Sequence, residues 1–342
     1  MRFDIKWLLR LQGSRALNVL RWMGGRSLAL GALQFFVTEN CNYRCNMCDI
    51  GQRNLARIPL NRDMIPFELM DKALTETASW FPRPRVHFIG GEPLMYKELG
   101  RAAARLRELG FWWGFTTNGW FLERDAELLV ESRCAAINVS VDGPADAHDS
   151  IRGIAHAFDK ALAGIARVRE VQKARKQNNP AIAVNCVVNP TNQDRLEEVV
   201  HAFSAVGVDT VNFQHLIWSE KDNREFATQI DPERLHKFIE KARSGVFPIR
   251  VLFMPDLAPE KLEPYYQNLY SPLLATSCSW PWLVARVMPD GNVGLCMDTL
   301  GNLRDTPLSK MWNGPAAQEM RRRMLAKPAS DPMCVRCCHR QY

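Results

Sequence analysis

Residues 33–48 have the sequence LQFFVTENCNYRCNMC, an apolar run followed closely by three cysteines. The run 33–37 predicts a buried strand, which places Cys41, Cys45 and Cys48 in the loop at its carboxyl end. Three thiolates this close together can hold three corners of a [4Fe–4S] cluster and leave one iron open. The alternative is a structural zinc site, but such a site needs four closed ligands, and no fourth Cys or His lies nearby in the sequence.

Strands and helices alternate downstream of this loop. The pattern indicates six β/α units and a parallel sheet, buried on both faces, that curls into a partial (β/α)6 barrel. In this α/β fold, ligands gather at the carboxyl ends of the strands. The predicted strands are 33–37, 85–89, 111–117, 136–141, 181–188 and 210–215, and the predicted helices are 66–80, 99–109, 125–132, 158–176, 193–206 and 231–243.

A glycine-rich turn ends the second predicted strand, in the sequence HFIGGEP over residues 87–93. Two adjacent glycines, Gly90 and Gly91, let the backbone approach a ligand closely, and the carboxylate of Glu92 can accept from an ammonium group. Taken alone, the turn is equally consistent with a simple strand-to-helix connection. One β/α unit after the cysteine loop, it becomes a strong signal.

With these two motifs, the chain from about residue 33 to 215 resembles the radical S-adenosylmethionine (radical SAM) superfamily. The resemblance implies that Cys41, Cys45 and Cys48 ligate a [4Fe–4S] cluster whose open iron chelates the amino and carboxylate groups of S-adenosylmethionine (SAM). Reductive cleavage of SAM then yields methionine and a 5′-deoxyadenosyl radical, which abstracts hydrogen from a substrate. An external flavodoxin or ferredoxin is the expected electron donor.

The resemblance also implies cofactor-binding roles for residues at other strand ends. The turn of Gly90, Gly91, Glu92 and Pro93 is expected to contact the methionine amino group of SAM, and Asn118 follows the third strand in the run TTNG. The remaining candidates are Ser140 and Asp142 near the ribose, Arg152 on the methionine carboxylate, and the polar residue Asn185 of the fifth strand.

Each of these residues has a structural alternative. Ser140 and Asp142 are also suited to capping a turn, and Arg152 to a surface ion pair. Asn185, like Asn189 nearby, is either a polar ligand or a cap at the end of its strand.

The C-terminal cysteines form a second unit that resembles the auxiliary-cluster region called SPASM in its full form and twitch in its shorter form. Cys278, Cys296, Cys334 and Cys337 would close one further [4Fe–4S] cluster, and the chain lacks the additional cysteine pattern of the full form. A zinc site with the same four ligands is the alternative. The resemblance therefore implies two clusters, one binding SAM and one auxiliary.

Three cysteines are left over. Cys338 directly follows Cys337 and is either an alternative ligand, a hydrogen donor to a substrate radical, or a bystander. Cys134 and Cys186 are expected to be buried apolar residues, with hydrogen donation as the lesser alternative.

Composition and charge bound the remaining possibilities. The chain of 342 residues is 46% apolar with 10 Trp, which excludes a disordered protein. Without an export signal or a membrane span, the protein is expected in the cytoplasm, where clustered cysteines indicate metal ligands rather than disulfides. We predict a helical extension over 1–32, the barrel over 33–243, a Pro-rich connection over 244–277 and the auxiliary-cluster region over 278–342.

Most of the formal net charge of +7 lies in the first forty or so residues, in a segment with amphipathic spacing. Residues 1–32 are therefore expected either to cover the barrel or to lie on an anionic membrane or lipid. Nucleic-acid binding is not expected, because the remaining charge is spread thinly and the run 321–323 (RRR) is typical of a solvated helix face.

The function that these observations favour is a radical SAM enzyme that removes hydrogen from a small molecule such as a sugar, a cyclitol or a lipid-linked group. The auxiliary cluster would accept the second electron of a net two-electron oxidation. A small molecule is favoured because the segment ahead of the first cluster leaves little room for a peptide-recognition domain. The alternatives are an epimerase that uses a thiol donor, a peptide-modifying maturase, or a zinc or iron–sulfur binding scaffold without enzymatic activity.

Overall fold

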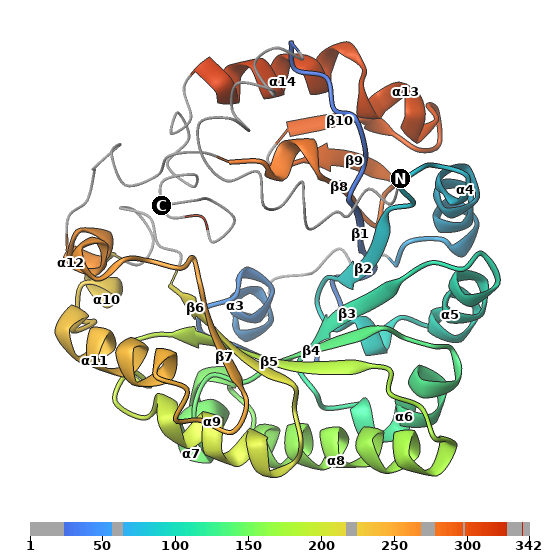
Figure 1. The fold of residues 1–342 in the computed structure, drawn as a ribbon. Coiled ribbons are helices and arrows are strands. Elements are labelled where there is room, and N and C mark those ends of the chain that lie inside the picture. Colours follow the sequence, from blue (N-terminus) through green and yellow to red (C-terminus); the bar gives the residue numbers. More distant parts are fainter. Residues whose placement is uncertain are drawn as a thin grey trace.

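The computed structural model describes residues 24–56, 64–216, 224–267, 278–296, 298–326 and 337. Within these ranges the strands form one sheet in the order β10-β9-β8-β1-β2-β3-β4-β5-β6-β7 (Figure 1). The strands are β1 (Ala32–Phe36), β2 (Arg85–Ile89), β3 (Trp113–Thr117), β4 (Ala136–Ser140), β5 (Ala181–Val188), β6 (Thr210–His215), β7 (Arg250–Met254), β8 (Val284–Val287), β9 (Asn292–Leu295) and β10 (Asp298–Asn302).

The strands from β8 through β1 to β7 all pair in parallel, whereas β9 and β10 are antiparallel additions beside β8. Most of the helices lie outside the curved sheet (Figure 1). The predicted α/β partial barrel is confirmed. The α-helices are α3 (Asp49–Leu55), α4 (Phe67–Ala78), α5 (Leu99–Glu108), α6 (Leu122–Glu131), α7 (Ala145–Arg152), α8 (Ala157–Arg175), α9 (Leu196–Ala205), α10 (Arg224–Ala227), α11 (Pro232–Arg243), α12 (Pro259–Gln267), α13 (Leu308–Trp312) and α14 (Pro315–Ala326), with 3₁₀ turns η1 (Pro93–Met95) and η2 (Trp280–Trp282).

The two faces of the sheet differ in burial. In β1, Leu33 and Phe35 are fully buried in the core, while Gln34 between them is half-buried. The same alternation recurs in β2 and β4 to β6. Helix α5 shows the matching period, because its buried residues Leu99, Ala102, Ala103 and Leu106 form one stripe. The expected burial on both faces therefore holds only for the helix-covered face, and the concave face is half-buried.

The Pro-rich stretch 244–277, expected to be a connection, contains a strand and a helix. Strand β7 pairs in parallel with β6 and adds a seventh β/α-type strand to the six that were predicted. Pro248 and Pro255 flank β7 without interrupting it, and Pro264 lies inside α12. Prolines beside a short edge strand hide its pattern, because they are typical of loops and of strand edges alike.

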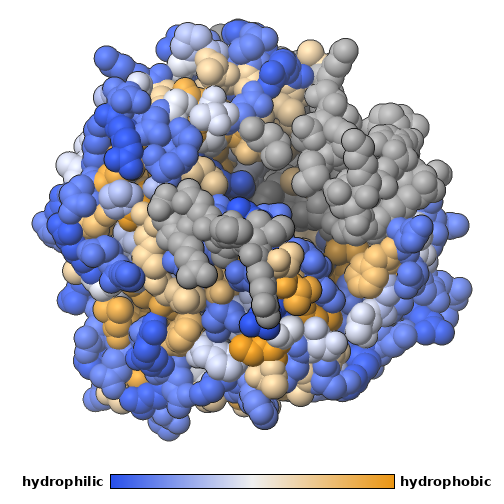
Figure 2. All heavy atoms as spheres, turned by 180° about the vertical axis from the view of Figure 1, so that it is seen from behind, coloured by the Kyte–Doolittle hydropathy of each residue, from blue (hydrophilic) through white to orange (hydrophobic). Residues whose placement is uncertain are grey.

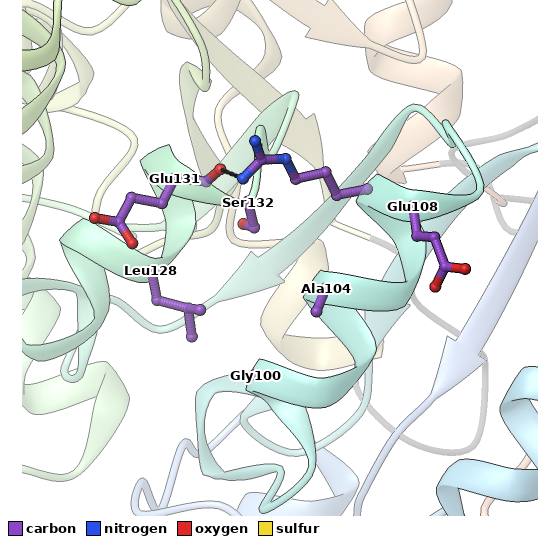
Figure 3. A pocket seen from close by; sticks show the side chains of 7 residues that line it. Gly100, Ala104, Glu108, Leu128, Glu131 and Ser132 are labelled. Carbon is purple, nitrogen blue, oxygen red and sulfur yellow. Dashed lines mark hydrogen bonds between the residues drawn. The ribbon is translucent and has the colours of Figure 1, made fainter.

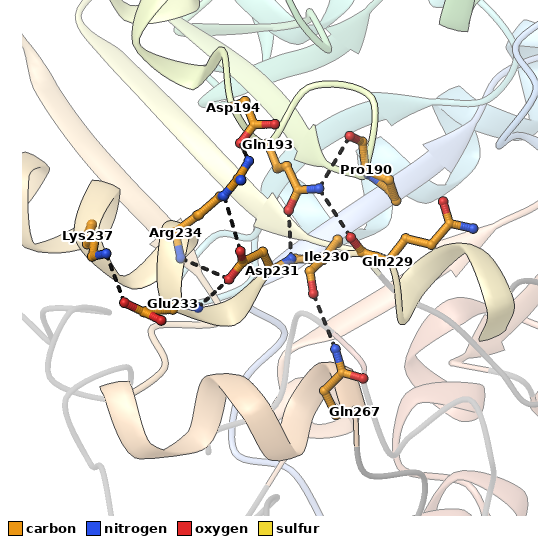
Figure 4. A network of polar contacts seen from close by, with 10 residues as sticks. All are labelled: Pro190, Gln193, Asp194, Gln229, Ile230, Asp231, Glu233, Arg234, Lys237 and Gln267. Atoms are coloured by element: carbon orange, nitrogen blue, oxygen red, sulfur yellow. Dashed lines mark hydrogen bonds and ion pairs between the residues drawn. The ribbon is translucent and has the colours of Figure 1, made fainter.

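A polar network joins the loop after β5 to the beginning of α11 (Figure 4). The Gln193 side chain accepts a hydrogen bond from the Asp231 backbone (2.7 Å) and donates to the Gln229 carbonyl (3.2 Å). Asp231 in turn caps α11 by accepting from the backbone of Glu233 and Arg234. These bonds fix the carboxyl edge of the sheet between β5 and β7.

The C-terminal region continues the barrel sheet, because β8 pairs with β1. Helix α4 holds this region from the outside: Lys72 donates to the Leu303 carbonyl (2.6 Å), and the Glu76 carboxylate accepts from the backbone of Leu308 (2.9 Å) and Ser309 (2.8 Å). The cysteine-bearing segment is thereby attached to the first β/α unit.

Arg321 corrects the expectation that the run 321–323 is a solvated helix face. Its side chain is fully buried and donates to the carbonyls of Pro281 (2.8 Å) and Gly25 (3.2 Å) and to Asn313 Oδ1 (3.0 Å). The guanidinium also lies over the Trp312 ring, and burial lowers its pKa to about 10. Arg321 therefore connects α14, the 3₁₀ turn η2 and the segment that precedes β1.

Only residues 24–32 of the predicted N-terminal extension lie within the described ranges. Ser27 binds the C-terminal region there, through its backbone N–H to Asn313 Oδ1 (2.8 Å) and its hydroxyl to the Trp282 carbonyl (2.7 Å). The rest of the extension, and with it the membrane-contact hypothesis, falls outside the described residues. In the part of the chain that the structure describes, no helix has the length and apolar character to cross a membrane.

Replacement of Arg321 by Met should destabilise the protein by about 3 kcal/mol, because three buried acceptors lose their donor. Arg322→Met is the matched control, since that side chain is exposed one position further along α14. Urea unfolding of the reconstituted protein measures both. Equal stability of the two variants would contradict the connecting role of Arg321.

Candidate active site

The three cysteines of residues 41–48 lie in the loop at the carboxyl end of β1, as predicted. Cys41 is half-buried, Cys45 is buried and Cys48 is exposed. Helix α3 folds back onto this loop, where the Asn54 side chain donates to the carbonyls of Cys41 (3.3 Å) and Tyr43 (3.1 Å). The loop is therefore held by the helix that follows it.

The glycine turn after β2 holds the same loop from one side. The backbone N–H of Gly91 donates to the Thr38 carbonyl, and that of Glu92 to the Asn40 carbonyl, both at 2.7 Å. A Cβ on Gly90 would lie 2.4 Å from the Thr38 oxygen, and one on Gly91 would lie 2.2 Å from the Asn40 oxygen. Gly90 also has a φ of +143°, so this close approach requires glycine.

Glu92 is fully buried and its carboxylate accepts three hydrogen bonds. Oε1 accepts from the backbone of Leu94 (2.9 Å) and from Thr117 Oγ1 (2.7 Å), and Oε2 accepts from the backbone of Asn118 (2.7 Å). Burial raises its pKa to about 7, although the three bonds act in the opposite direction. Glu92 thus joins the turn after β2 to the end of β3, and buried Pro93 begins the 3₁₀ turn η1.

Asn118, a predicted cofactor contact, lies beside the cysteine loop. Its side-chain Nδ2 donates to Asn42 Oδ1 (2.8 Å) and points at Cys41 Sγ (3.9 Å). The Tyr43 backbone N–H also donates to Cys41 Sγ (3.5 Å). Two N–H groups therefore surround the sulfur of Cys41.

Arg152 and Asp142 form a buried ion pair on the other side of the loop. Arg152 Nη2 lies 2.5 Å from Asp142 Oδ2, and Arg152 Nη1 donates to Cys45 Sγ (3.8 Å). Burial disfavours the charged guanidinium, but Asp142 and Cys45 outweigh it and raise the pKa of Arg152. The surface ion pair considered for Arg152 is therefore wrong, because Asp142 is fully buried and the Arg152 side chain is only 11% exposed.

The backbone around Arg152 also binds the cysteine loop. The Arg44 N–H donates to the Arg152 carbonyl and the Asn46 N–H to the Ile151 carbonyl, both at 3.1 Å. Asp142 is fixed in turn, since its Oδ1 accepts from the Val187 backbone (2.9 Å). The loop is thus bound by the turn after β2 on one side and by the end of α7 on the other.

Ser140 and Asn185 are neighbours across β4 and β5, and both are half-buried on the concave face. Asn185 Oδ1 accepts from Asn212 Nδ2 (2.9 Å) of β6. Asn189 does not join Ser140 and Asn185 on the concave face. Its side chain forms hydrogen bonds with the local backbone of Val187 (3.0 Å) and Thr191 (2.9 Å) and so caps the end of the strand.

The donors around the thiols fit sulfur ligands of an iron–sulfur cluster, because N–H groups directed at sulfur stabilise its anionic form. Without a metal, burial raises the pKa of Cys41 to about 12 and also raises that of Cys45, so both are neutral thiols at pH 7. Among the described residues, no three His, Cys, Asp or Glu side chains already converge into a metal site. Metal binding must therefore deprotonate and gather these thiols.

The C-terminal cysteines are described in part. Cys278 precedes η2, Cys296 follows β9 with a φ of +50°, and both are half-buried, as is Cys337. Cys334 and Cys338 lie outside the described residues. Cys134 and Cys186 are fully buried in the core, as expected.

The described residues line two surface hollows. One of about 780 Å³ reaches Asn40, the residue before Cys41, and is bordered by Tyr96 and Lys97. The other, of about 430 Å³, lies between α5 and α6, where Arg107 donates to the Glu131 carbonyl (3.0 Å) (Figure 3). This second hollow is on the helical outside of the barrel and contains none of the predicted site residues.

Sequence reasoning missed several residues that position the site. Thr117 binds Glu92, and Asn42 and Tyr43 form contacts around Cys41 and Asn118. His148 Nδ1 accepts from the Asp142 backbone (3.0 Å). Thr117, Asn42 and Tyr43 lie inside the quoted motifs, so their position in a motif was the available signal. Nothing in the sequence indicates the hydrogen bond that His148 accepts from Asp142.

Gly91→Ala should destabilise the protein by more than about 2 kcal/mol and reduce its iron content, because the added Cβ collides with the cysteine loop. Gly100→Ala in α5 is the matched control, since nothing lies within 4 Å of its added Cβ. Chemical unfolding and iron analysis measure both variants. Full stability and iron content in Gly91→Ala would contradict the described contact.

Glu92→Gln should lower the melting temperature, because one of its three donors would then face an amide NH₂. The pKa of Glu92 is raised from 4.5 to about 7, so its contribution to stability is present below pH 4.5 and lost as the pH rises through about 7. The difference in melting temperature between wild type and variant should narrow over that window. A difference that widens with pH would contradict the assignment.

Two protein-family models match parts of this chain. The model of the radical SAM superfamily matches residues 35–178, and that of an iron–sulfur cluster-binding domain, SPASM, matches residues 278–338. A Fe-coproporphyrin III synthase of Methanosarcina barkeri is 26% identical over 336 residues, covering 88% of this chain and 79% of the relative. A pre-heme d1 synthase of Dinoroseobacter shibae is 23% identical over 333 residues, covering 89% and 78% respectively.

The fold is also found among solved structures. Streptococcus suis SuiB bound to S-adenosylmethionine superposes with a TM-score of 0.66 at 14% identity, covering 90% of this chain and 71% of SuiB. The radical SAM domain binds a [4Fe–4S] cluster and SAM, and a SPASM domain indicates auxiliary iron–sulfur clusters. Residues 35–178 therefore form a domain of the radical SAM superfamily, and residues 278–338 form a C-terminal iron–sulfur region of the SPASM type.

Proposed function

We propose that Cys41, Cys45 and Cys48 ligate the SAM-binding cluster of a radical SAM enzyme that acts on a small molecule. The observation that carries this proposal is the attachment of the cysteine loop on both sides, together with N–H donors directed at Cys41 and Cys45. When bound and reduced, the cluster supplies cleavage of SAM to methionine and a 5′-deoxyadenosyl radical. Of the three cysteines, Cys45 is buried, Cys41 is half-buried and Cys48 is exposed.

We assign the methionine end of SAM to the turn after β2 and to Arg152. The Glu92 carboxylate already accepts three hydrogen bonds, so the backbone of Gly90 and Gly91 is the better acceptor for the amino group. Arg152 Nε is buried without a hydrogen-bond partner, which leaves one donor for the methionine carboxylate. Asn118, Ser140, Asp142 and Asn185 would line the nucleoside end.

We assign the auxiliary cluster to Cys278, Cys296, Cys334 and Cys337. For a net oxidation the substrate would lose one hydrogen atom to the deoxyadenosyl group, one electron to the auxiliary cluster and one proton to a base. An external flavodoxin or ferredoxin would supply the electron for SAM cleavage. Epimerisation is the alternative outcome and would need a thiol hydrogen donor such as Cys338.

The small-molecule class is supported by the concave face, whose half-buried residues Gln34, His87, Asn185, Asn212 and Gln214 offer hydrogen bonds to a polar substrate. Both relatives named above are called synthases of heme-type tetrapyrroles. We therefore add tetrapyrroles to the sugars, cyclitols and lipid-linked groups expected from the sequence. The likeness to SuiB extends to the fold alone at 14% identity, so it lends no weight to a peptide substrate.

Replacement of single cysteines tests the cluster assignments. Anaerobically reconstituted wild type should contain about eight irons per chain and release 5′-deoxyadenosine from SAM on reduction, and Cys45→Ala should retain about four irons and release none. Cys296→Ala should also retain about four irons but still cleave SAM.

Cys134→Ala is the control for these variants, because Cys134 is fully buried in the core away from both groups. It should keep the iron content and the nucleoside yield of the wild type. Stoichiometric zinc with no nucleoside from the wild type would overturn the proposal, as would full SAM cleavage by Cys45→Ala.

A further inference from the structure

The strands of the barrel contain no acidic residue. From β1 to β8 no Asp or Glu occurs, whereas β2, β7 and β8 each carry one arginine: Arg85, Arg250 and Arg286. Arg85 and Arg250 are exposed and begin their strands. Arg286 is different, because it is half-buried inside β8.

Register and burial place Arg286 on the concave face. Its neighbours Ala285 and Val287 are fully buried in the helix-covered core, so Arg286 has the opposite orientation. It pairs with Gln34 of β1, which pairs with His87 of β2. His87 shares this face with Thr116, since His87 Nε2 lies 2.9 Å from Thr116 Oγ1. Arg286, Gln34 and His87 therefore form one polar row across three strands.

The Arg286 guanidinium has no compensating group within the described residues. Its Nε atom is buried without a hydrogen-bond partner, and no ion pair joins it to a described carboxylate. The two acids of the candidate site have other partners, since Asp142 pairs with Arg152 and Glu92 accepts three hydrogen bonds. A buried donor without a hydrogen-bond partner costs folding free energy unless a ligand accepts a hydrogen bond from it. Seen from behind, hydrophilic residues show at the centre of the molecule between the atoms drawn in grey (Figure 2).

We propose that Arg286 receives a carboxylate group of the substrate within the barrel, an inference that rests on the small-molecule function proposed above. The guanidinium offers two parallel N–H donors that match a carboxylate. Gln34 and His87 supply further hydrogen bonds along the same row. The substrate is thereby held by β8, which the C-terminal region contributes, and reacts at the end formed by the cysteine loop.

The charge of the row favours a carboxylate over a phosphate. Burial lowers the pKa of His87 to about 4, so His87 is neutral at pH 7 and Arg286 is the one cation of the row. A carboxylate balances that single charge, whereas a dianionic phosphate would leave one buried charge without a partner.

Equilibrium binding tests the proposal with coproporphyrin III, a porphyrin that carries several carboxylates, and with its methyl ester. The reconstituted holoprotein is titrated anaerobically with each compound, and absorbance follows binding. Wild type should bind the acid, and Arg286→Gln should raise its Kd by about tenfold or more. Arg286→Lys should bind the acid more tightly than Arg286→Gln does. The methyl ester should bind the wild type no more tightly than the acid binds Arg286→Gln.

Arg85→Gln is the matched control, because Arg85 belongs to the same set of acid-free strands, β1 to β8, but is exposed at the beginning of β2. Its Kd for the acid should equal that of the wild type. Melting temperatures and iron contents of all variants show whether Arg286→Gln still folds and holds its clusters. If Arg286→Gln does not fold, the comparison of Arg286→Lys with wild type and of acid with ester decides the question.

Absence of saturable binding by wild type, equal affinity of wild type and Arg286→Gln, or equal affinity for acid and ester would each overturn the proposal. Release of 5′-deoxyadenosine from SAM, measured on the same samples, keeps it distinct from the proposed function. Cleavage without carboxylate binding would remove the Arg286 assignment alone. Carboxylate binding without cleavage would instead remove the radical function.

Discussion

The backbone contacts of the cysteine loop are the constraint on which the site depends. Four main-chain hydrogen bonds attach this loop to its neighbours, two from the glycine turn after β2 and two to the end of α7. Backbone groups cannot be replaced by another side chain, so the loop position follows from the strand order and from the two glycines. Glu92 and Arg152 reinforce the two attachments, because each binds a further element of the barrel.

This arrangement separates the two roles of the sheet. One face buries apolar residues such as Phe35 and Phe88 under the helices, and that packing stabilises the fold. The concave face holds amides, hydroxyls and a single interior arginine, and it is only half-buried. In the proposed function, a bound substrate and cofactor would stabilise the polar groups on that face. The SPASM-type region joins the barrel through β8, so both cluster regions belong to one sheet.

The periodic parts of this fold could be predicted from the sequence, and the parts set by tertiary contacts could not. Strands β1 to β6 show clear apolar runs, and α5 shows a full helical stripe at Leu99, Ala102, Ala103 and Leu106. Strand β7 was missed because Pro248 and Pro255 resemble loop residues. Arg321 was misjudged because burial of a charged side chain depends on acceptors far away in the chain.

For the candidate site as well, local motifs could be predicted from the sequence and tertiary contacts could not. The cysteines and the GGEP turn are local motifs with a chemical rationale, so the sequence indicated both of them. The partners of Glu92 and Arg152 come from other strands, and no local pattern contains them. The unpartnered guanidinium of Arg286 likewise emerges only when the register of β8 against β1 is known.

In the proposed function, the loop of Cys41, Cys45 and Cys48 holds a cluster with an open iron for SAM. Electron paramagnetic resonance of the Cys278→Ala/Cys296→Ala double variant tests it most directly, because that variant should retain this cluster alone. After reduction, addition of SAM should change the spectrum of the remaining cluster, since SAM becomes a ligand of one iron. A reduced cluster signal that SAM leaves unchanged, or no cluster signal at all, would contradict the claim.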